Sequence, residues 1–266
     1  MPELPEVETI VRQLKPALLN KIIKALHIHW PKTVEMTPFQ AENIRNRKIL
    51  DIIRRGKWIL FLLDDSSRLA IHLRMTGQLS LSSLVGRKQH LRVEIEFSDL
   101  QRLFFYDPRK FGRIRLVDSY EKSWLNEIGV EPLCDDSLIS VLISLQSRRT
   151  VKAVLLDQTI VAGIGNIYAD EALFLARVNP LRLFCSLTET ERHHLAAAVR
   201  EVLLLAIENG GSTISSYRSL HGESGFHQQH HLVYQRNGQK CIHCRSIILR
   251  TRTAGRSTHF CPTCQL

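Results

Sequence analysis

Residues 241–264 read CIHCRSIILRTRTAGRSTHFCPTC, and this stretch decides the fold of the last part of the chain. Cys241 and Cys244 form one Cys-x-x-Cys pair, and Cys261 and Cys264 form a second after sixteen intervening residues. Two such turns place four thiolates around one tetrahedral ion. Because all four ligands are thiols, the site has no open position for catalysis. We therefore predict one structural Zn²⁺ per chain.

The residues between the cysteine pairs predict a β-hairpin, with Ile247–Leu249 and Thr258–Phe260 as its strands. A segment this short has no core of its own, so the metal supplies its folding free energy. Three arginines surround Gly255 at the tip: Arg250, Arg252 and Arg256. A solvated basic turn is one interpretation, but a rigid ribbon that presents cations is more typical of a nucleic-acid reader.

The composition points in the same direction. The 266 residues carry a formal charge of +10, with 36 Lys and Arg against 26 Asp and Glu. Such an excess favours a polyanionic partner. Because no basic amphipathic helix stands out in the sequence, nucleic acid is favoured over a membrane surface. No apolar run is long enough to span a bilayer and no secretory signal is visible, so we expect a cytosolic protein. The two cysteines outside the cluster, Cys134 and Cys185, are expected to be ordinary buried thiols.

The hydrophobic pattern divides the chain into a strand-rich and a helical part. Short apolar runs separated by turn residues predict strands near 48–54, 58–63, 69–75, 91–97, 103–106 and 114–117. Many short strands at this spacing indicate a two-layer sandwich or a barrel. Helical periodicity follows at 138–145, 151–156, 167–175 and 188–208. Residues 212–234 are polar without a period, and we expect a mobile loop there.

The chain begins Met1-Pro2-Glu3-Leu4-Pro5-Glu6-Val7-Glu8. If Met1 is removed, the Pro2 nitrogen becomes a secondary amine that can form an iminium with an aldehydic carbon. An amphipathic helix is predicted from Pro5, and its positive end disfavours the ammonium form of the nearby amine. Glu3 and Glu6 act in the opposite direction. A Met-Pro start without any role is the alternative.

Residues 161–168, Val-Ala-Gly-Ile-Gly-Asn-Ile-Tyr, superficially match a dinucleotide-binding turn. Tyr168 stands where that turn needs a third small residue, so a nicotinamide oxidoreductase is disfavoured and no nucleotide cofactor is expected. A corner between two helices fits better. We expect Asn166 to cap the second helix and the backbone N–H groups of the corner to bind a phosphate.

Five motifs occur in order along the chain: residues 2–8, Arg55-Gly56-Lys57, residues 107–112 (Asp-Pro-Arg-Lys-Phe-Gly), the stretch 163–174 and the four-cysteine finger. Together they resemble the formamidopyrimidine-DNA glycosylase family over essentially the whole chain. The resemblance implies an α+β multidomain fold. Its expected parts are a catalytic β-sandwich domain with flanking helices (1–118), a helix-two-turn-helix DNA-binding domain with a lesion-capping loop (119–234), and a β-hairpin zinc finger (235–266).

The same resemblance implies a bifunctional DNA glycosylase and AP lyase of base excision repair, acting on 8-oxoguanine and formamidopyrimidines in duplex DNA. Pro2 would attack C1′ and form a Schiff base while Glu3 handles protons at the sugar. Lys57 would be the proton donor for β-elimination. Arg256 would contact phosphate and assist δ-elimination.

A nucleotide attacked at C1′ must be flipped out of the stack, and something must fill the gap. The resemblance assigns the gap-filling side chains to Met75, Arg109 and Phe111. It also places four residues near phosphates or the lesion: His90, Arg148, Lys152 and Asn166. The expected partner is damaged double-stranded DNA, and one active site per chain needs no second copy, so a monomer is expected.

Two departures from the family pattern lie near the finger, at Gly225-Phe226-His227 and at 233–238, which reads Val-Tyr-Gln-Arg-Asn-Gly. They affect the predicted base preference, because the first lies in the segment that covers the flipped base. An endonuclease VIII-like enzyme for oxidised pyrimidines is therefore one alternative. A non-catalytic zinc-finger DNA-binding protein is another, although it would not require Pro2, Glu3 and Lys57 together.

Overall fold

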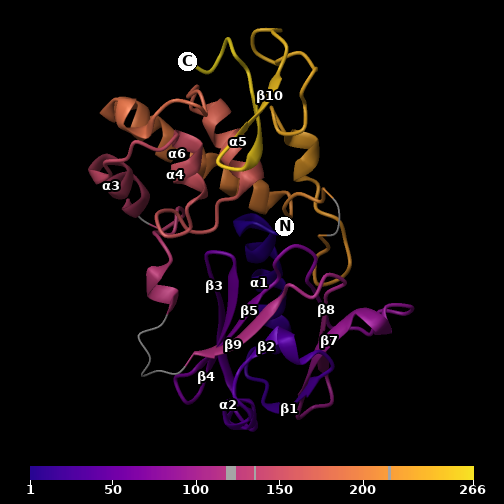
Figure 1. The fold of residues 1–266 in the computed structure, drawn as a ribbon. Helices are drawn as coiled ribbons and strands as arrows, with labels where there is room; N and C mark the ends of the chain where they lie inside the picture. The colour runs from indigo at the N-terminus through magenta and orange to yellow at the C-terminus, as the bar shows by residue number, and fades with distance from the viewer. Residues whose placement is uncertain (118–123, 135, 215–216) are drawn as a thin grey trace. The chain divides into compact units, whose positions relative to one another are not determined.

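The computed structural model describes residues 1–117, 124–134, 136–214 and 217–266. These residues form two compact units, each built from two stretches of chain. Unit 1 contains residues 1–125 and 210–226, and unit 2 contains residues 126–209 and 227–266. Figure 1 shows the strands of the first unit and the helices and C-terminal hairpin of the second.

The helices are α1 (Leu4–Leu18), α2 (Pro38–Asn43), α3 (Ser137–Ser144), α4 (Val151–Leu156), α5 (Asn166–Leu175) and α6 (Glu189–Glu208). Short 3₁₀ turns are η1 (Pro31–Thr33), η2 (Lys88–His90), η3 (Trp124–Glu127), η4 (Phe184–Ser186) and η5 (His227–His230). The strands are β1 (Ile23–Ile28), β2 (Val34–Glu35), β3 (Ile49–Arg55), β4 (Trp58–Leu63), β5 (Arg68–His72), β6 (Gln78–Ser80), β7 (Leu91–Phe97), β8 (Arg102–Tyr106), β9 (Arg113–Val117), β10 (Leu249–Thr253) and β11 (Arg256–Phe260).

Unit 1 holds two sheets over one hydrophobic core. Among the described residues, the strand orders are β1-β7-β8-β6 and β2-β9-β5-β4-β3, antiparallel except for the parallel pair β2 and β9. Helix α1 supplies apolar side chains at helical spacing to this core, including Val7, Ile10, Leu14 and Leu18. Its first residues are therefore fixed by the packing of the whole unit rather than left as a loose terminus.

Unit 2 combines the helices with the C-terminal hairpin. Strands β10 and β11 pair antiparallel, and Ala254 and Gly255 connect them with φ values of 49° and 71°. Two consecutive positive φ angles define a tight hairpin turn whose twist matches that of its strands. The finger has a small core of its own, in which Phe174 of α5 packs with Val233, Ile248 and two cysteines.

The architecture confirms the predicted α+β multidomain fold and its strand-rich first half. The helix α2 was missed, although Thr37 and Gln40 form a reciprocal capping box that the sequence signals. Strands β1, β2 and β6 were not predicted individually. Among the described residues, no helix has both the length and the apolar character needed to cross a bilayer.

The segment 212–234, expected to be a mobile loop, is packed in the parts that the structure describes. Residues 215 and 216 of that segment lie outside the described residues. Tyr217 and Leu220 belong to the core of unit 1. In unit 2, the buried carboxylate of Glu171 accepts hydrogen bonds from three consecutive backbone N–H groups, those of residues 232–234, at 2.7–3.0 Å.

Candidate active site

The N-terminal segment is buried and held by a carboxylate. Pro2 and Glu3 are buried, whereas Met1 is 42% exposed. Oε2 of Glu6 accepts a hydrogen bond from the Glu3 backbone N–H at 2.7 Å, and Oε1 accepts one from the Ser212 N–H at 2.7 Å. One side chain thus connects the start of α1 to the residues that follow α6. This arrangement sets the position of the Pro2 nitrogen.

The residues that follow α6 leave no space for a further side chain beside Glu6. A Cβ on Gly211, whose φ is 78°, would lie 2.8 Å from Glu6 Oε1. A Cβ on Gly225 would lie 2.1 Å from the Gly211 carbonyl oxygen. The Tyr217 hydroxyl donates to the Gly210 carbonyl at 3.2 Å, and burial followed by the charge of Glu6 raises the pKa of this phenol above its usual range. These glycines permit the close approach that Glu6 requires.

Lys57 lies in the turn between β3 and β4 and is only 7% exposed. Gly56, with φ 57°, allows the turn to close. The Arg54 guanidinium donates to Glu8 of α1 at 3.0 Å and to the Gly56 carbonyl at 3.2 Å. The Lys57 turn is therefore fixed to the same helix that begins beside Pro2.

A buried histidine accompanies this lysine. The His72 ring packs edge-on against Trp58, with centroids 4.7 Å apart, and its Nδ1 accepts the Arg74 backbone N–H at 2.9 Å. Burial, helped by the charges of Arg74, Lys57 and Arg115, lowers the pKa of His72 to about 3. The ring is therefore neutral at physiological pH.

This shift predicts a pH-dependent stability of unit 1. An unfolded histidine has a pKa near 6.5, so below that pH the unfolded chain binds a proton that folded His72 does not. Stability is fully present above pH 6.5 and is lost as pH falls, by about 2 kcal/mol between pH 7.5 and 5. His72→Asn keeps an acceptor for the Arg74 N–H, and we expect it to remove that share of the pH dependence. Urea unfolding followed by tryptophan fluorescence measures it. An equal loss in both proteins would contradict the assignment.

The three predicted gap-filling side chains, Met75, Arg109 and Phe111, all lie in unit 1. Met75 is partly buried, while Arg109 is exposed and Phe111 is 45% exposed. The Arg109 guanidinium lies 4.8 Å from the centre of the Phe111 ring, within cation–π range. A cation stacked on an exposed aromatic ring can contact both bases and phosphates.

A cavity of about 400 Å³ opens beside these side chains. Most of its lining residues carry hydrogen-bonding side chains, and two of them are arginines: Thr76, Gln78, Gly86, Arg87, Gln89, His90, Tyr106, Pro108 and Arg218. Arg87 donates to the Gln78 side-chain oxygen at 3.0 Å, and Arg218 follows Tyr217, whose hydroxyl donates to the Gly210 carbonyl. The cavity has the volume and the hydrogen-bonding groups that a purine-sized ligand needs.

In unit 2 the helix corner contacts the finger hairpin. Helix α5 begins at Asn166 with Gly165 as its N-cap, so Asn166 is the first helical residue and not the predicted cap. Its Nδ2 donates to the Ser257 carbonyl at 2.9 Å. Ser257 follows Arg256, which is exposed at the turn of the hairpin, and Arg148 is also exposed. The hairpin tip thus has a fixed position relative to the corner.

Lys152, predicted to lie near phosphates or the lesion, does not lie on the surface of unit 2. It is fully buried, 2.6 Å from Asp170, and donates to the Ser257 carbonyl and the Thr258 hydroxyl at 2.9 Å each. Asp170 also accepts the His259 backbone N–H at 2.9 Å. A buried ammonium needs such a partner because isolated charge is costly in a protein interior. Lys152 therefore holds the hairpin to α4 and α5.

The four cysteines of the finger come together as predicted. Their Sγ atoms, from Cys241, Cys244, Cys261 and Cys264, all lie within 4.8 Å of one another. Four thiolates without a fifth donor fit a tetrahedral structural Zn²⁺. The other two cysteines correct the prediction of buried thiols, because Cys134 and Cys185 are both exposed.

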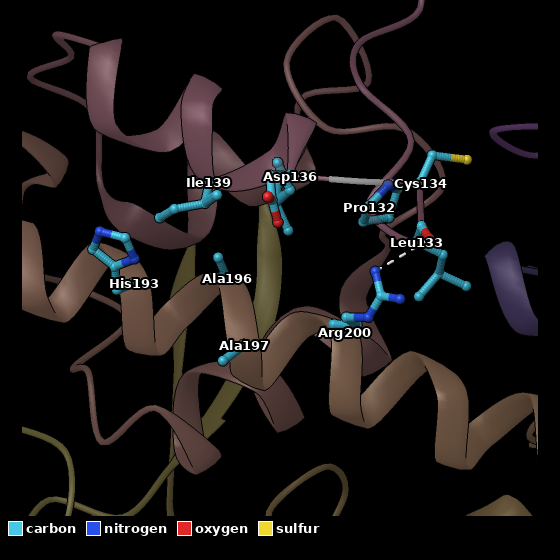
Figure 2. Close-up of a pocket in the computed structure, with 10 residues that line it drawn as sticks. Pro132, Leu133, Cys134, Asp136, Ile139, His193, Ala196, Ala197 and Arg200 are labelled. Carbon is cyan, nitrogen blue, oxygen red and sulfur yellow. Dashed lines mark hydrogen bonds between the residues drawn. The ribbon is translucent and has the colours of Figure 1, made fainter.

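A second cavity, of about 660 Å³, lies between α3, α6 and the segment before α3 (Figure 2). Cys134, Asp136, His193 and Arg200 line it, and Arg200 donates to the Leu133 carbonyl at 3.2 Å. None of the predicted site residues lies in this cavity.

Comparison with known proteins agrees with these features. Sequence models match three parts of the chain: the formamidopyrimidine-DNA glycosylase N-terminal domain over residues 1–114, its H2TH domain over residues 128–218, and a zinc finger found in FPG and IleRS over residues 238–266. The chain belongs to the formamidopyrimidine-DNA glycosylase family. It is 46% identical over 272 residues to the formamidopyrimidine-DNA glycosylase of Chloroflexus aurantiacus, covering 100% of this chain and 98% of that protein.

Solved structures of the family have the same fold. The MutM (FPG) protein of Thermus thermophilus superposes with a TM-score of 0.88 at 44% identity, covering 99% of this chain and 98% of that one. A complex of Lactococcus lactis Fpg with DNA containing an abasic site gives a TM-score of 0.87 at 36% identity, with 99% of both chains covered. A MutM complex with DNA containing carbocyclic 8-oxo-G gives a TM-score of 0.87 at 37% identity, again with 99% of both chains covered.

Proposed function

We propose that the protein is a DNA glycosylase and AP lyase of base excision repair that removes oxidised purines through a Schiff base on Pro2. The buried and carboxylate-held N-terminus is the main support, because a reactive amine must be placed with little freedom to attack one carbon. Removal of Met1 is part of the proposal. Damaged duplex DNA would be the substrate. We also propose that the protein acts as a monomer in the cytoplasm.

In the proposed reaction the Pro2 nitrogen attacks C1′ of a flipped nucleotide as the bond from C1′ to the base breaks. The base departs with a proton. The Pro2 nitrogen then loses its own proton, the C1′–O4′ bond breaks as O4′ takes up a proton, and the opened sugar remains attached to Pro2 as an iminium ion. The iminium acidifies the C2′ hydrogen, so its loss breaks the C3′–O bond, and a second elimination breaks the C5′–O bond. Glu3, buried next to Pro2, would move protons at the sugar.

Two further groups would act on the eliminations. Lys57, in the turn held to α1 by Arg54, would be a proton donor during β-elimination. Arg256, exposed at the hairpin turn, would bind phosphate and assist δ-elimination. We also propose that phosphates are contacted by His90, Arg148 and the helix corner at Asn166. Lys152 would instead fix the position of the hairpin that carries Arg256.

Met75, Arg109 and Phe111 would fill the gap left by the flipped nucleotide. The flipped base would enter the 400 Å³ cavity, whose Gln78 amide and two guanidiniums offer hydrogen bonds to a purine edge. Flipping costs a few kcal/mol, which the wedge and the cavity contacts offset. The donor groups of Gln78, Arg87 and Arg218 also favour a ligand with carbonyl groups, such as 8-oxoguanine.

Borohydride trapping tests this proposal. The protein is incubated with a duplex carrying 8-oxoguanine opposite cytosine, borohydride is added, and a covalent adduct is expected on denaturing gels. A second duplex carries an oxidised pyrimidine. An adduct with the second duplex alone would select the endonuclease VIII-like alternative. No adduct with either, together with tight DNA binding, would select a non-catalytic DNA-binding protein.

A further inference from the structure

The residue Met75 stands on a tight turn at the end of β5. The Gly77 N–H donates to the Leu73 carbonyl at 2.9 Å, and Arg74 has a φ of 53°. A Cβ on Gly77 would lie 2.4 Å from the Leu73 oxygen, so the turn closes only around glycine. The next side chain, Thr76, donates its hydroxyl to Oδ1 of Asp107.

Asp107 also organises the loop that carries Arg109 and Phe111. Its Oδ1 accepts the Arg109 backbone N–H at 3.2 Å, and its Oδ2 accepts the Gly112 N–H at 2.8 Å. A Cβ on Gly112 would lie 2.3 Å from the Phe105 ring, so the loop packs directly on β8. Phe111 is exposed, yet the backbone on both sides of it is fixed.

The Asp107 backbone adds further links. Its N–H donates to the His90 carbonyl at 2.9 Å, and its carbonyl accepts the Arg92 Nε at 2.8 Å. The whole residue is completely buried. A buried carboxylate is costly unless it is hydrogen-bonded, and here it accepts hydrogen bonds from two segments 31 residues apart in sequence. One buried group therefore joins the Met75 turn and the Arg109–Phe111 loop.

We propose that Asp107 is a positioning residue that couples these two segments into one wedge, with the Thr76 hydroxyl as the link. A wedge of two independent segments would lose more conformational freedom each time it enters the duplex. Coupled segments enter together, which lowers the cost of displacing the nucleotide. This inference rests on the proposed function, and it concerns base flipping rather than the chemistry at C1′.

The test uses Thr76→Val, which removes the hydroxyl and keeps the shape. Two single-turnover rates are measured: base excision from an 8-oxoguanine:cytosine duplex, and cleavage at a preformed abasic site. We expect excision to slow about tenfold, because that is the effect on a rate of losing one hydrogen bond to a charged group. Cleavage at the abasic site should slow less than about threefold, because no base has to be unstacked there.

Three further single variants and one double variant make the result specific. Thr76→Ser restores the hydroxyl and should restore excision. Ser67→Ala removes a comparable bond from a hydroxyl to the Asp65 carboxylate, at 2.6 Å in the same unit, and controls for lost stability. Asp107→Ala removes both acceptor oxygens and should slow excision, and the double variant with Thr76→Val should be no slower than Asp107→Ala alone, because the link to Thr76 is already broken.

Several results would overturn the inference. These are unchanged excision by Thr76→Val, an equal loss on both substrates accompanied by a lower melting temperature, or multiplied effects in the double variant. Multiplied effects would mean that Thr76 contacts the base directly. Failure of the proposed function is distinguishable, since the unmodified protein would then give no borohydride adduct on any lesion.

Discussion

An uncleaved N-terminal extension should abolish formation of the borohydride adduct while leaving DNA binding intact. The extension converts the Pro2 nitrogen into an amide, which cannot attack C1′. Loss of a covalent nucleophile typically costs at least about 10³-fold in rate. Trapping on the 8-oxoguanine duplex measures the loss, and a gel-shift assay with an abasic-site analogue measures binding.

Pro2→Gly gives a less severe version of the same test. It leaves a primary amine with more freedom, since the pyrrolidine ring that fixes φ is gone. We expect sharply reduced trapping with DNA binding retained. For the N-terminal extension, the matched control carries the same residues at the C-terminus, and it should form the borohydride adduct normally. Full trapping by the N-terminally extended protein would show that another group, such as Lys57, is the nucleophile.

Removal of zinc should unfold the finger and abolish DNA binding while unit 1 stays folded. The buried core of the finger contains few residues, and two of them, Cys241 and Cys261, are ligands. Without the ion the hairpin cannot keep its fold. Arg256 would then lose its fixed position, and the affinity for duplex DNA should fall by at least about 100-fold at physiological salt.

The positions of the tryptophans allow the folding of unit 1 to be followed separately from that of the finger. Trp30, Trp58 and Trp124 all lie in unit 1, so their fluorescence reports that unit alone. After chelation we expect lost DNA binding with unchanged tryptophan emission, and recovery when Zn²⁺ is returned. Cys134→Ser/Cys185→Ser protein controls for reactions at the two exposed thiols. A collapse of tryptophan emission would contradict separately folding units.

Much of the fold could be predicted because its signals are local. The strands alternate or run apolar over short distances between turn residues, and α1 shows helical spacing from its first turn. The cysteine spacing alone predicts the metal cluster, because two tight turns of fixed length place the ligands. The proline at the start of the chain is likewise visible in sequence.

The remaining features depend on partners far apart in sequence. Lys152 resembles a solvated lysine at a helix start, and only Asp170 and residues 257–258 explain its burial. Asp107 appears as a turn residue, yet its carboxylate is shared with Thr76. In the sequence Glu6 looks like a charge that stabilises the helix dipole, but its carboxylate also accepts a hydrogen bond from the Ser212 backbone. Such contacts carry no sequence period, so a single sequence does not reveal them.

The attachment site of the trapped DNA shows which group of the protein is the nucleophile. The borohydride adduct with the 8-oxoguanine duplex is digested with nuclease and protease, and the modified peptide is identified by mass spectrometry. We expect the added sugar mass on the nitrogen of Pro2, in a peptide that lacks Met1. Added mass on Lys57, or on a peptide that still begins with Met1, would contradict this expectation.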